Sequence, residues 1–342
     1  MATTSDTLQR QRSSDIAVRL ARFRELGIVV FLIAVLGMTI AFQPDFLLKP
    51  INIRSILLWI PLLTVVAMGE MMVIITRGID VSIGSMLAFA GIVVGMIFRD
   101  VPGFNIYLGA LIGILLGALL GAVNGGLIAW LKIPPIITTL GTLSVYRGLV
   151  FIVSEGRQID PNHVPTALIR WSQRGPFGIQ WVPYVVLIAV VVAFLAYAFL
   201  RYTKGGRSIY AIGGNPEAAR LRGVPVETTT FSVYLITGAL CGLAGILYAS
   251  RFGFVNPGET GVGFELTVIA AVVVGGTNVF GGSGSVLGVF LGCLLLGTIN
   301  VALAVLGVAS TWQLAVYGFV ILLAVTVDAV IRRELRRATT GE

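Results

Sequence analysis

Long apolar runs separated by short polar stretches make up most of the chain from residue 27 onward. A helix needs about 20 apolar residues to cross the hydrocarbon core of a bilayer. The pattern predicts an all-α polytopic membrane protein with about ten transmembrane helices, at residues 27–43, 55–76, 82–98, 106–131, 135–153, 182–200, 229–249, 264–280, 284–306 and 311–330. The third and eighth runs are short and rich in glycine, so each is either a full span or a half-span, and eight to ten full spans fit the pattern.

The amino-acid composition supports a lipid environment. Hydrophobic residues make up 56% of the 342 residues and charged residues only 12%, whereas an ordinary soluble domain has about 25% charged residues. Two cysteines, Cys241 and Cys293, lie in apolar runs, and the single histidine, His163, lies in a polar loop. The sequence therefore predicts neither a disulfide framework nor a metal site or a bound cofactor.

The distribution of lysine and arginine predicts the orientation in the membrane. With ten spans and a cytoplasmic N-terminus, 16 of the 24 basic residues fall on the cytoplasmic side, where such residues gather in membrane proteins. Both termini are therefore expected in the cytoplasm. The predicted organisation is a tail at 1–26, a transmembrane domain at 27–330 and a tail at 331–342, with an external loop at 154–181 and a cytoplasmic loop at 201–228.

Two apolar stretches resemble each other. Residues 113–125, GILLGALLGAVNG, and residues 288–301, GVFLGCLLLGTINV, both carry repeated glycines and then an asparagine, Asn124 or Asn300. Small residues about one turn apart let helix backbones approach closely in lipid, so close packing of these helices is predicted. The similarity also fits two related halves around a central path, as in transporters with internal repeats.

Sequence motifs for catalysis are missing from the chain. It has no Gly-x4-Gly-Lys-Ser/Thr loop for ATP, and no His-Glu-x2-His, Gly-x-Ser-x-Gly or Cys-x2-Cys motif. The net charge is +8, but the basic residues are spread over the chain ends and short loops rather than gathered in the stripe that binds nucleic acid. Neither an enzyme nor a nucleic-acid-binding protein is predicted.

Three ionisable residues lie in or near predicted spans, where such residues are costly and often functional. Glu70 is the deepest, and it either lines a transport path or is a buried, hydrogen-bonded strut. Arg147 either lines a water-filled path or caps a broken helix, and Asp328 lies near the end of its span. No second group accompanies these residues at a spacing that suggests acid–base catalysis.

The stretch 211–231, AIGGNPEAARLRGVPVETTTF, predicts a two-turn helix on the cytoplasmic loop. Asparagine is a good N-cap and proline suits the first helical position, whereas the later glycine and proline end the helix. A helix this short is not stable alone, so it either packs on the protein's own loops or docks a soluble partner. The residues that define it are Asn215, Pro216, Glu217, Ala218, Ala219, Arg220 and Gly223.

Four stretches, TRGIDVSIGS, LKIPPIITTLGTLSVYRGL, GRSIYAIGGNPEAARLRGV and VVVGGTNVFGGSGSVLG, occur in this order between residues 50 and 330. Together they resemble the membrane permease of bacterial ATP-binding cassette (ABC) importers for monosaccharides, the ribose, xylose and rhamnose type that includes the autoinducer-2 importer. The resemblance implies a fold similar to the ten-helix permease of vitamin B12 import, and a place in the bacterial inner membrane.

The resemblance also implies partners and site residues. A separate cytoplasmic ATPase, which hydrolyses the ATP, a periplasmic sugar-binding protein and a second permease copy, identical or paralogous, are expected. The short helix at 215–223 matches the coupling helix that seats in a groove of the ATPase. A neutral sugar needs hydroxyl and amide hydrogen-bonding groups along its path. The path candidates are Glu70, Asp80, Asn124, Thr142, Arg147, Asn278 and Asn300.

Residues 75–85, ITRGIDVSIGS, place Arg77 and Asp80 between two apolar runs. We expect a break in helix continuity here, with Asp80 accepting hydrogen bonds from backbone N–H groups at the start of the next helix. A solvated turn and direct contact with the sugar are the two alternatives for this stretch.

Three other functions are alternatives to the importer. A secondary, ion-coupled sugar transporter usually needs coupling carboxylates near the midplane of the membrane, and only Glu70 qualifies. A passive channel needs no capped cytoplasmic helix. An intramembrane enzyme needs a paired catalytic constellation, which the sequence does not contain.

Overall fold

The computed structural model describes residues 25–176 and 182–309, together with Trp312, Ala315, Val316, Gly318, Phe319, Leu322 and Thr326. Helices dominate these residues, and eight of the described helices are long and apolar enough to cross a membrane. The predicted all-α polytopic membrane fold is confirmed. Nearly all of the two tails, Asp328 and most of the tenth predicted span fall outside the described residues.

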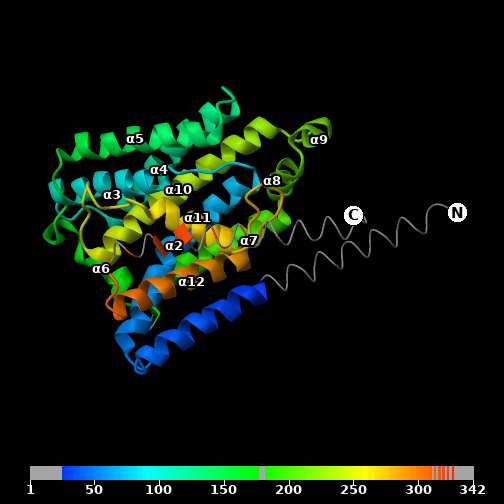
Figure 1. The fold of residues 1–342 in the computed structure, drawn as a ribbon. Coiled ribbons are helices and arrows are strands. Elements are labelled where there is room, and N and C mark those ends of the chain that lie inside the picture. The colour runs from blue at the N-terminus through cyan, green and yellow to red at the C-terminus, as the bar shows by residue number, and fades with distance from the viewer. Residues whose placement is uncertain are drawn as a thin grey trace.

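Figure 1 shows the described residues folded into a bundle of helices. The described helices are an N-terminal helix at Glu25–Phe42, α2 (Pro50–Ile75), α3 (Ile83–Asp100), α4 (Ile106–Ala129), α5 (Pro135–Ser154), the 3₁₀ turn η1 (Pro161–His163), α6 (Thr166–Gln173), α7 (Tyr184–Tyr202), α8 (Lys204–Gly214), α9 (Pro216–Leu221), α10 (Val226–Phe252), α11 (Phe264–Val274) and α12 (Val286–Val305).

The eighth predicted span is corrected by the structure. Helix α11 has only 11 residues and ends at Val274, so the half-span alternative is right for this run and the full span at 264–280 is wrong. The chain turns at Gly276, which has a φ of 94°, a conformation that favours glycine. The third run does form a full-length helix, since α3 has 18 residues.

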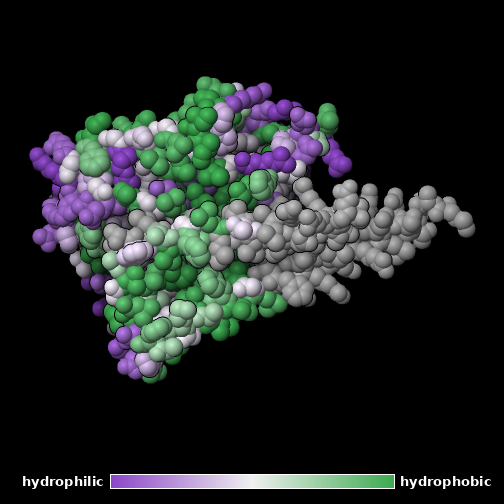
Figure 2. Space-filling view, viewed as in Figure 1, coloured by the Kyte–Doolittle hydropathy of each residue, from purple (hydrophilic) through white to green (hydrophobic). Residues whose placement is uncertain are grey.

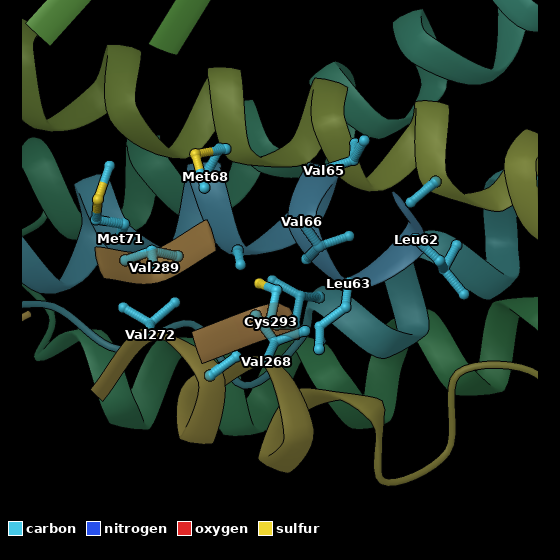
Figure 3. Packing of buried hydrophobic residues seen from close by; sticks show 14 of the residues in the cluster. Leu62, Leu63, Val65, Val66, Met68, Met71, Val268, Val272, Val289 and Cys293 are labelled. Atoms are coloured by element: carbon cyan, nitrogen blue, oxygen red, sulfur yellow. The ribbon is translucent and has the colours of Figure 1, made fainter. Parts of the chain in front are cut away.

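Helix α2 lies at the centre of the helix bundle, where every residue from Ile60 to Ile75 is buried. Figure 3 shows side chains from α2, α11 and α12 packed together, among them Val66, Val268 and Cys293. Lipid tails are as apolar as these side chains, so the contacts stabilise the bundle mainly through close van der Waals packing. Cys293 is a buried free thiol in this core, as the sequence predicts.

Helices α4 and α10 cross at backbone contact, with glycines on both sides. A Cβ atom on Gly117 would lie 2.1 Å from the carbonyl oxygen of Gly238, and one on Gly121 would lie 2.2 Å from that of Tyr234. Helices α12 and α11 also approach to backbone contact at a glycine, because a Cβ on Gly292 would lie 2.2 Å from the carbonyl oxygen of Ala271 in α11. The predicted close packing of both glycine-rich stretches is confirmed.

Replacing Gly117 by alanine is expected to lower the free energy of unfolding by about 2 kcal/mol, because the added methyl group forces the two backbones apart. Thermal unfolding of the detergent-solubilised protein, followed by tryptophan fluorescence, measures the change. The control is Gly126→Ala on the same helix, where the nearest atoms to an added Cβ belong to the Trp130 side chain at 3.6 Å. Equal melting temperatures for the two variants would contradict the prediction.

The surface of the molecule has apolar flanks and hydrophilic ends, as a membrane-spanning protein requires. Figure 2 shows apolar side chains over the flanks of the helix bundle and hydrophilic side chains gathered at its ends, one of these groups lying around α8 and α9. On α4 the exposed apolar side chains repeat at every fourth position, as Leu111, Leu115 and Leu119, which is one helix face open to lipid. The chain is a multi-pass membrane protein.

Candidate functional site

Buried polar side chains gather at the break between α2 and α3. Helix α2 ends at Ile75 and α3 begins at Ile83, and Asp80 between them is fully buried. Its Oδ1 atom accepts hydrogen bonds from the backbone N–H of Ser82, at 2.9 Å, and from the Ser82 hydroxyl, at 2.6 Å. The predicted helix break with Asp80 bound to backbone N–H is confirmed, and a solvated turn is excluded.

Glu70 connects α2 to this break. The side chain is fully buried, and its Oε1 atom accepts a hydrogen bond of 3.1 Å from the backbone N–H of Asp80. Its other oxygen, Oε2, has no hydrogen-bond partner within the described part of the chain. These contacts are those of the strut alternative, and contact with a transported solute stays a prediction.

Two more helices bring polar side chains to the same place. Asn124 of α4 donates from Nδ2 to the Ser82 hydroxyl at 2.9 Å and to Asp80 Oδ2 at 3.3 Å. The hydroxyl of Tyr146 in α5 lies 3.0 Å from Asn124 Oδ1 and 2.9 Å from the carbonyl oxygen of Leu120. We call Glu70, Asp80, Ser82, Asn124 and Tyr146 the buried polar cluster. It joins α2, α3, α4 and α5.

Tyr146 was not among the sequence candidates, although its position carries a signal. Thr139 and Tyr146 are seven residues apart on α5 and thus share one helix face. Thr139 donates to the backbone carbonyl of Ile79, at 3.1 Å, inside the same break. Thr142 lies on this face as well and is buried. The polar face of α5 is therefore directed at the α2–α3 break.

Two other path candidates, Arg147 and Asn278, form hydrogen bonds to backbone groups outside the buried polar cluster. Arg147 donates from Nη1 to the carbonyl oxygens of Pro257, at 3.1 Å, and Thr260, at 2.8 Å, so it supports the connection before α11. Asn278 closes the turn after α11 by donating to the carbonyl of Gly281 at 2.6 Å. Asn300 is half-buried on α12. The described residues contain no cluster of His, Cys, Asp or Glu that fits a metal ion.

The predicted short helix forms as α9. The Oδ1 atom of Asn215 accepts hydrogen bonds of 3.0 Å from the backbone N–H groups of Glu217 and Ala218, so the predicted N-cap is confirmed. Pro216 occupies the first turn. Gly223 adopts a φ of 79° just beyond the helix, which confirms the predicted stop.

One face of α9 packs on the protein and the other is open. Ala219 is buried, whereas Leu221 is 90% exposed at the end of the helix. Arg220 forms an ion pair with Glu227 at the start of α10, which holds α9 in place. Leu221 was not among the sequence candidates, because a single apolar residue on a polar surface helix does not by itself indicate a contact.

The outward face of α5 carries small and polar residues among large apolar ones, since Val145 and Ile152 are exposed on it as well. Gly141 and Ser144 are exposed, and a Cβ atom added to Gly141 or to Gly148 would meet nothing within 4 Å. Small and polar residues on a membrane helix typically face another helix or a water-filled path rather than lipid. This outer face lies opposite the one that contacts the buried polar cluster.

Comparisons with known proteins agree with this architecture. The sequence pattern of the family described as "Branched-chain amino acid transport system / permease component" matches residues 52–325. No solved structure matches the chain. The autoinducer 2 import system permease protein of Photorhabdus laumondii is 36% identical over 79% of each chain. The ribose import permease protein of Bacillus subtilis is 40% identical over 91% of this chain and 92% of its own.

A third relative, the D-allose transport system permease protein of Escherichia coli, is 34% identical over 90% of this chain and 91% of its own. In all three relatives the similarity covers most of both sequences, and the family pattern covers most of the membrane-spanning part of this chain. The chain therefore belongs to the family of permease components of the branched-chain amino acid transport system type.

Proposed function

We propose that this chain is the permease subunit of an ABC importer that carries a monosaccharide or a similar small polyol into a bacterial cell. The similarity to a ribose import permease over nine-tenths of both chains carries the proposal. The family description names branched-chain amino acids, but the relatives at 34–40% identity are named for ribose, allose and autoinducer 2. Nothing favours a secondary transporter.

The proposed complex contains two partners of this chain, an ATPase and a periplasmic binding protein. Because the sequence has no loop for ATP, a separate ATPase supplies the energy from the cytoplasm and binds α9. A periplasmic binding protein delivers the solute, and both chain termini lie on the cytoplasmic side of the inner membrane. The capped helix α9, with its exposed Leu221, supports this contact.

We place the solute path between two permease copies, along the outer face of α5. Gly141, Ser144 and Gly148 on this face are small or polar, and they leave room for a second copy or a hydrated solute. The buried polar cluster lies behind this face and holds α5 to the α2–α3 break. In this arrangement Asp80 and Asn124 set the position of α5 and do not contact the solute in the conformation described.

Uptake into proteoliposomes tests the proposed function. We expect import of labelled ribose or allose by the permease reconstituted with its cognate ATPase, and a fall to background when either ATP or the binding protein is left out. Labelled leucine is the control solute for the family description and should not be imported. Uptake driven by an ion gradient without ATP would overturn the proposal.

A further inference from the structure

Arg77 joins two helices that lie far apart in the sequence. Its Nε atom donates to the carbonyl oxygen of Gly213 at 2.8 Å, and its Nη2 atom donates to that of Gly214 at 2.6 Å. Gly213 and Gly214 are the last two residues of α8, where carbonyl groups lack helical partners and attract positive charge. The guanidinium thus donates two hydrogen bonds to the end of α8.

The backbone of Arg77 is held in a conformation that non-glycine residues seldom adopt. Its φ is 69°, and Arg77 lies two residues beyond the end of α2 at Ile75. Such a conformation persists where surrounding contacts determine it, and it is often found at functional positions. Here the conformation sends the side chain of Arg77 to the end of α8.

Three backbone segments meet around this contact. A Cβ atom on Gly213 would lie 2.0 Å from the carbonyl oxygen of Ile75, so α8 touches the end of α2. The same Ile75 oxygen accepts a hydrogen bond of 2.9 Å from the backbone N–H of Gly282, in the turn after α11. The Tyr210 hydroxyl donates to the carbonyl of Gly284 at 3.0 Å. The end of α8 therefore packs against the end of α2 and is hydrogen-bonded to the connection between α11 and α12.

We propose that Arg77 is a positioning residue that couples movement of α9 to the α2–α3 break. This inference rests on the proposed function, in which an ATPase binds α9. Only Asn215 separates α8 from α9, so force on α9 reaches the end of α8 directly. Arg77 passes that force to the break, where Asp80 follows three residues later and is bound by Glu70. Without the arginine, only the backbone packing against Ile75 and the Tyr210 hydrogen bond connect α8 to these segments, so less of the movement of α9 reaches the break.

The test measures how many ATP molecules are hydrolysed for each solute imported. Proteoliposomes contain the permease, its ATPase and its binding protein. We expect Arg77→Lys and Arg77→Gly to raise the ratio of ATP to solute by about fivefold or more. Lysine keeps the charge but cannot bind both carbonyls in the same fork, and glycine suits the positive φ. A loss of folded protein lowers both rates together and leaves this ratio unchanged.

Matched variants separate coupling from general damage. Lys132→Ala removes an exposed cation whose φ is 55°, and it should keep the wild-type ratio. Gly213→Ala presses α8 away from Ile75 and should uncouple like the arginine variants. Gly214→Ala should not, because an added Cβ there meets nothing within 4 Å.

The outcomes distinguish this inference from the proposed function. ATP-dependent import by the wild type, together with a wild-type ratio in Arg77→Lys, Arg77→Gly and Gly213→Ala, would overturn the coupling role of Arg77. The coupling role would also be overturned if these three variants failed to fold and to assemble with the ATPase while Lys132→Ala and Gly214→Ala did both. Arg77 would then serve folding alone. Absence of ATP-dependent import by the wild type would instead contradict the proposed function.

Discussion

Replacing Leu221 by aspartate is expected to abolish uptake and to weaken binding of the ATPase about thirtyfold, the loss typical of a central interface residue. Leu221 is 90% exposed on α9 in the chain alone, so the substitution does not disturb the protein's own core. In the proposed complex this leucine enters an apolar groove of the ATPase, and a carboxylate there would be desolvated without a partner. Co-purification of the ATPase in detergent measures the binding.

The control for this variant is Leu131→Asp. Leu131 is also an exposed leucine, at 64%, and it lies in the connection between α4 and α5, which the sequence places on the same side of the membrane. Its replacement should leave ATPase binding intact. Ala219 is unsuitable for the test, because it is buried and a larger side chain there would displace α9 itself. Undiminished ATPase binding and uptake in Leu221→Asp would refute docking through α9.

Features set by neighbouring residues were accessible from the sequence alone. The cap at Asn215 and the stop at Gly223 depend on a few consecutive residues, and the structure reproduces both. The bond from the Ser82 backbone to Asp80 spans two residues and was also expected. In each case the stabilising contact lies within one turn of the chain, so the sequence pattern contains all the groups involved.

Contacts between distant segments were not accessible in this way. The bond between Arg77 and the end of α8 joins residues 136 and 137 positions apart, and nothing in either segment specifies the other. The end of α11 was also misplaced, since residues 264–280 are apolar enough for a span and the turn depends on glycines packed against α8 and α12. Small residues permit both a continuous helix and a turn, and tertiary packing decides between them.

Replacing Asp80 by alanine is expected to have the largest effect on stability. The carboxylate accepts from the Ser82 backbone, the Ser82 hydroxyl and Asn124, and its removal leaves these donors buried. A buried unpaired polar group costs about 1–3 kcal/mol, so the total loss is about 4 kcal/mol. Because a native protein is stable by only about 5–15 kcal/mol, we expect a sharp fall in melting temperature and in the yield of folded protein.

A polar exchange tests whether the hydrogen bonds themselves cause this loss. In Asp80→Asn the oxygen facing Ser82 is kept, but an NH₂ group then faces the NH₂ of Asn124, so an intermediate melting temperature is expected. Combining it with Asn124→Asp restores a donor facing an acceptor and should recover part of the loss, which a double-mutant cycle measures. Asp100→Ala is the control, since that carboxylate is exposed at the end of α3 and pairs only with its neighbour Arg99 among the described residues. If Asp80→Ala melted at the same temperature as Asp100→Ala, the buried polar cluster would not hold α3, α4 and α5 together.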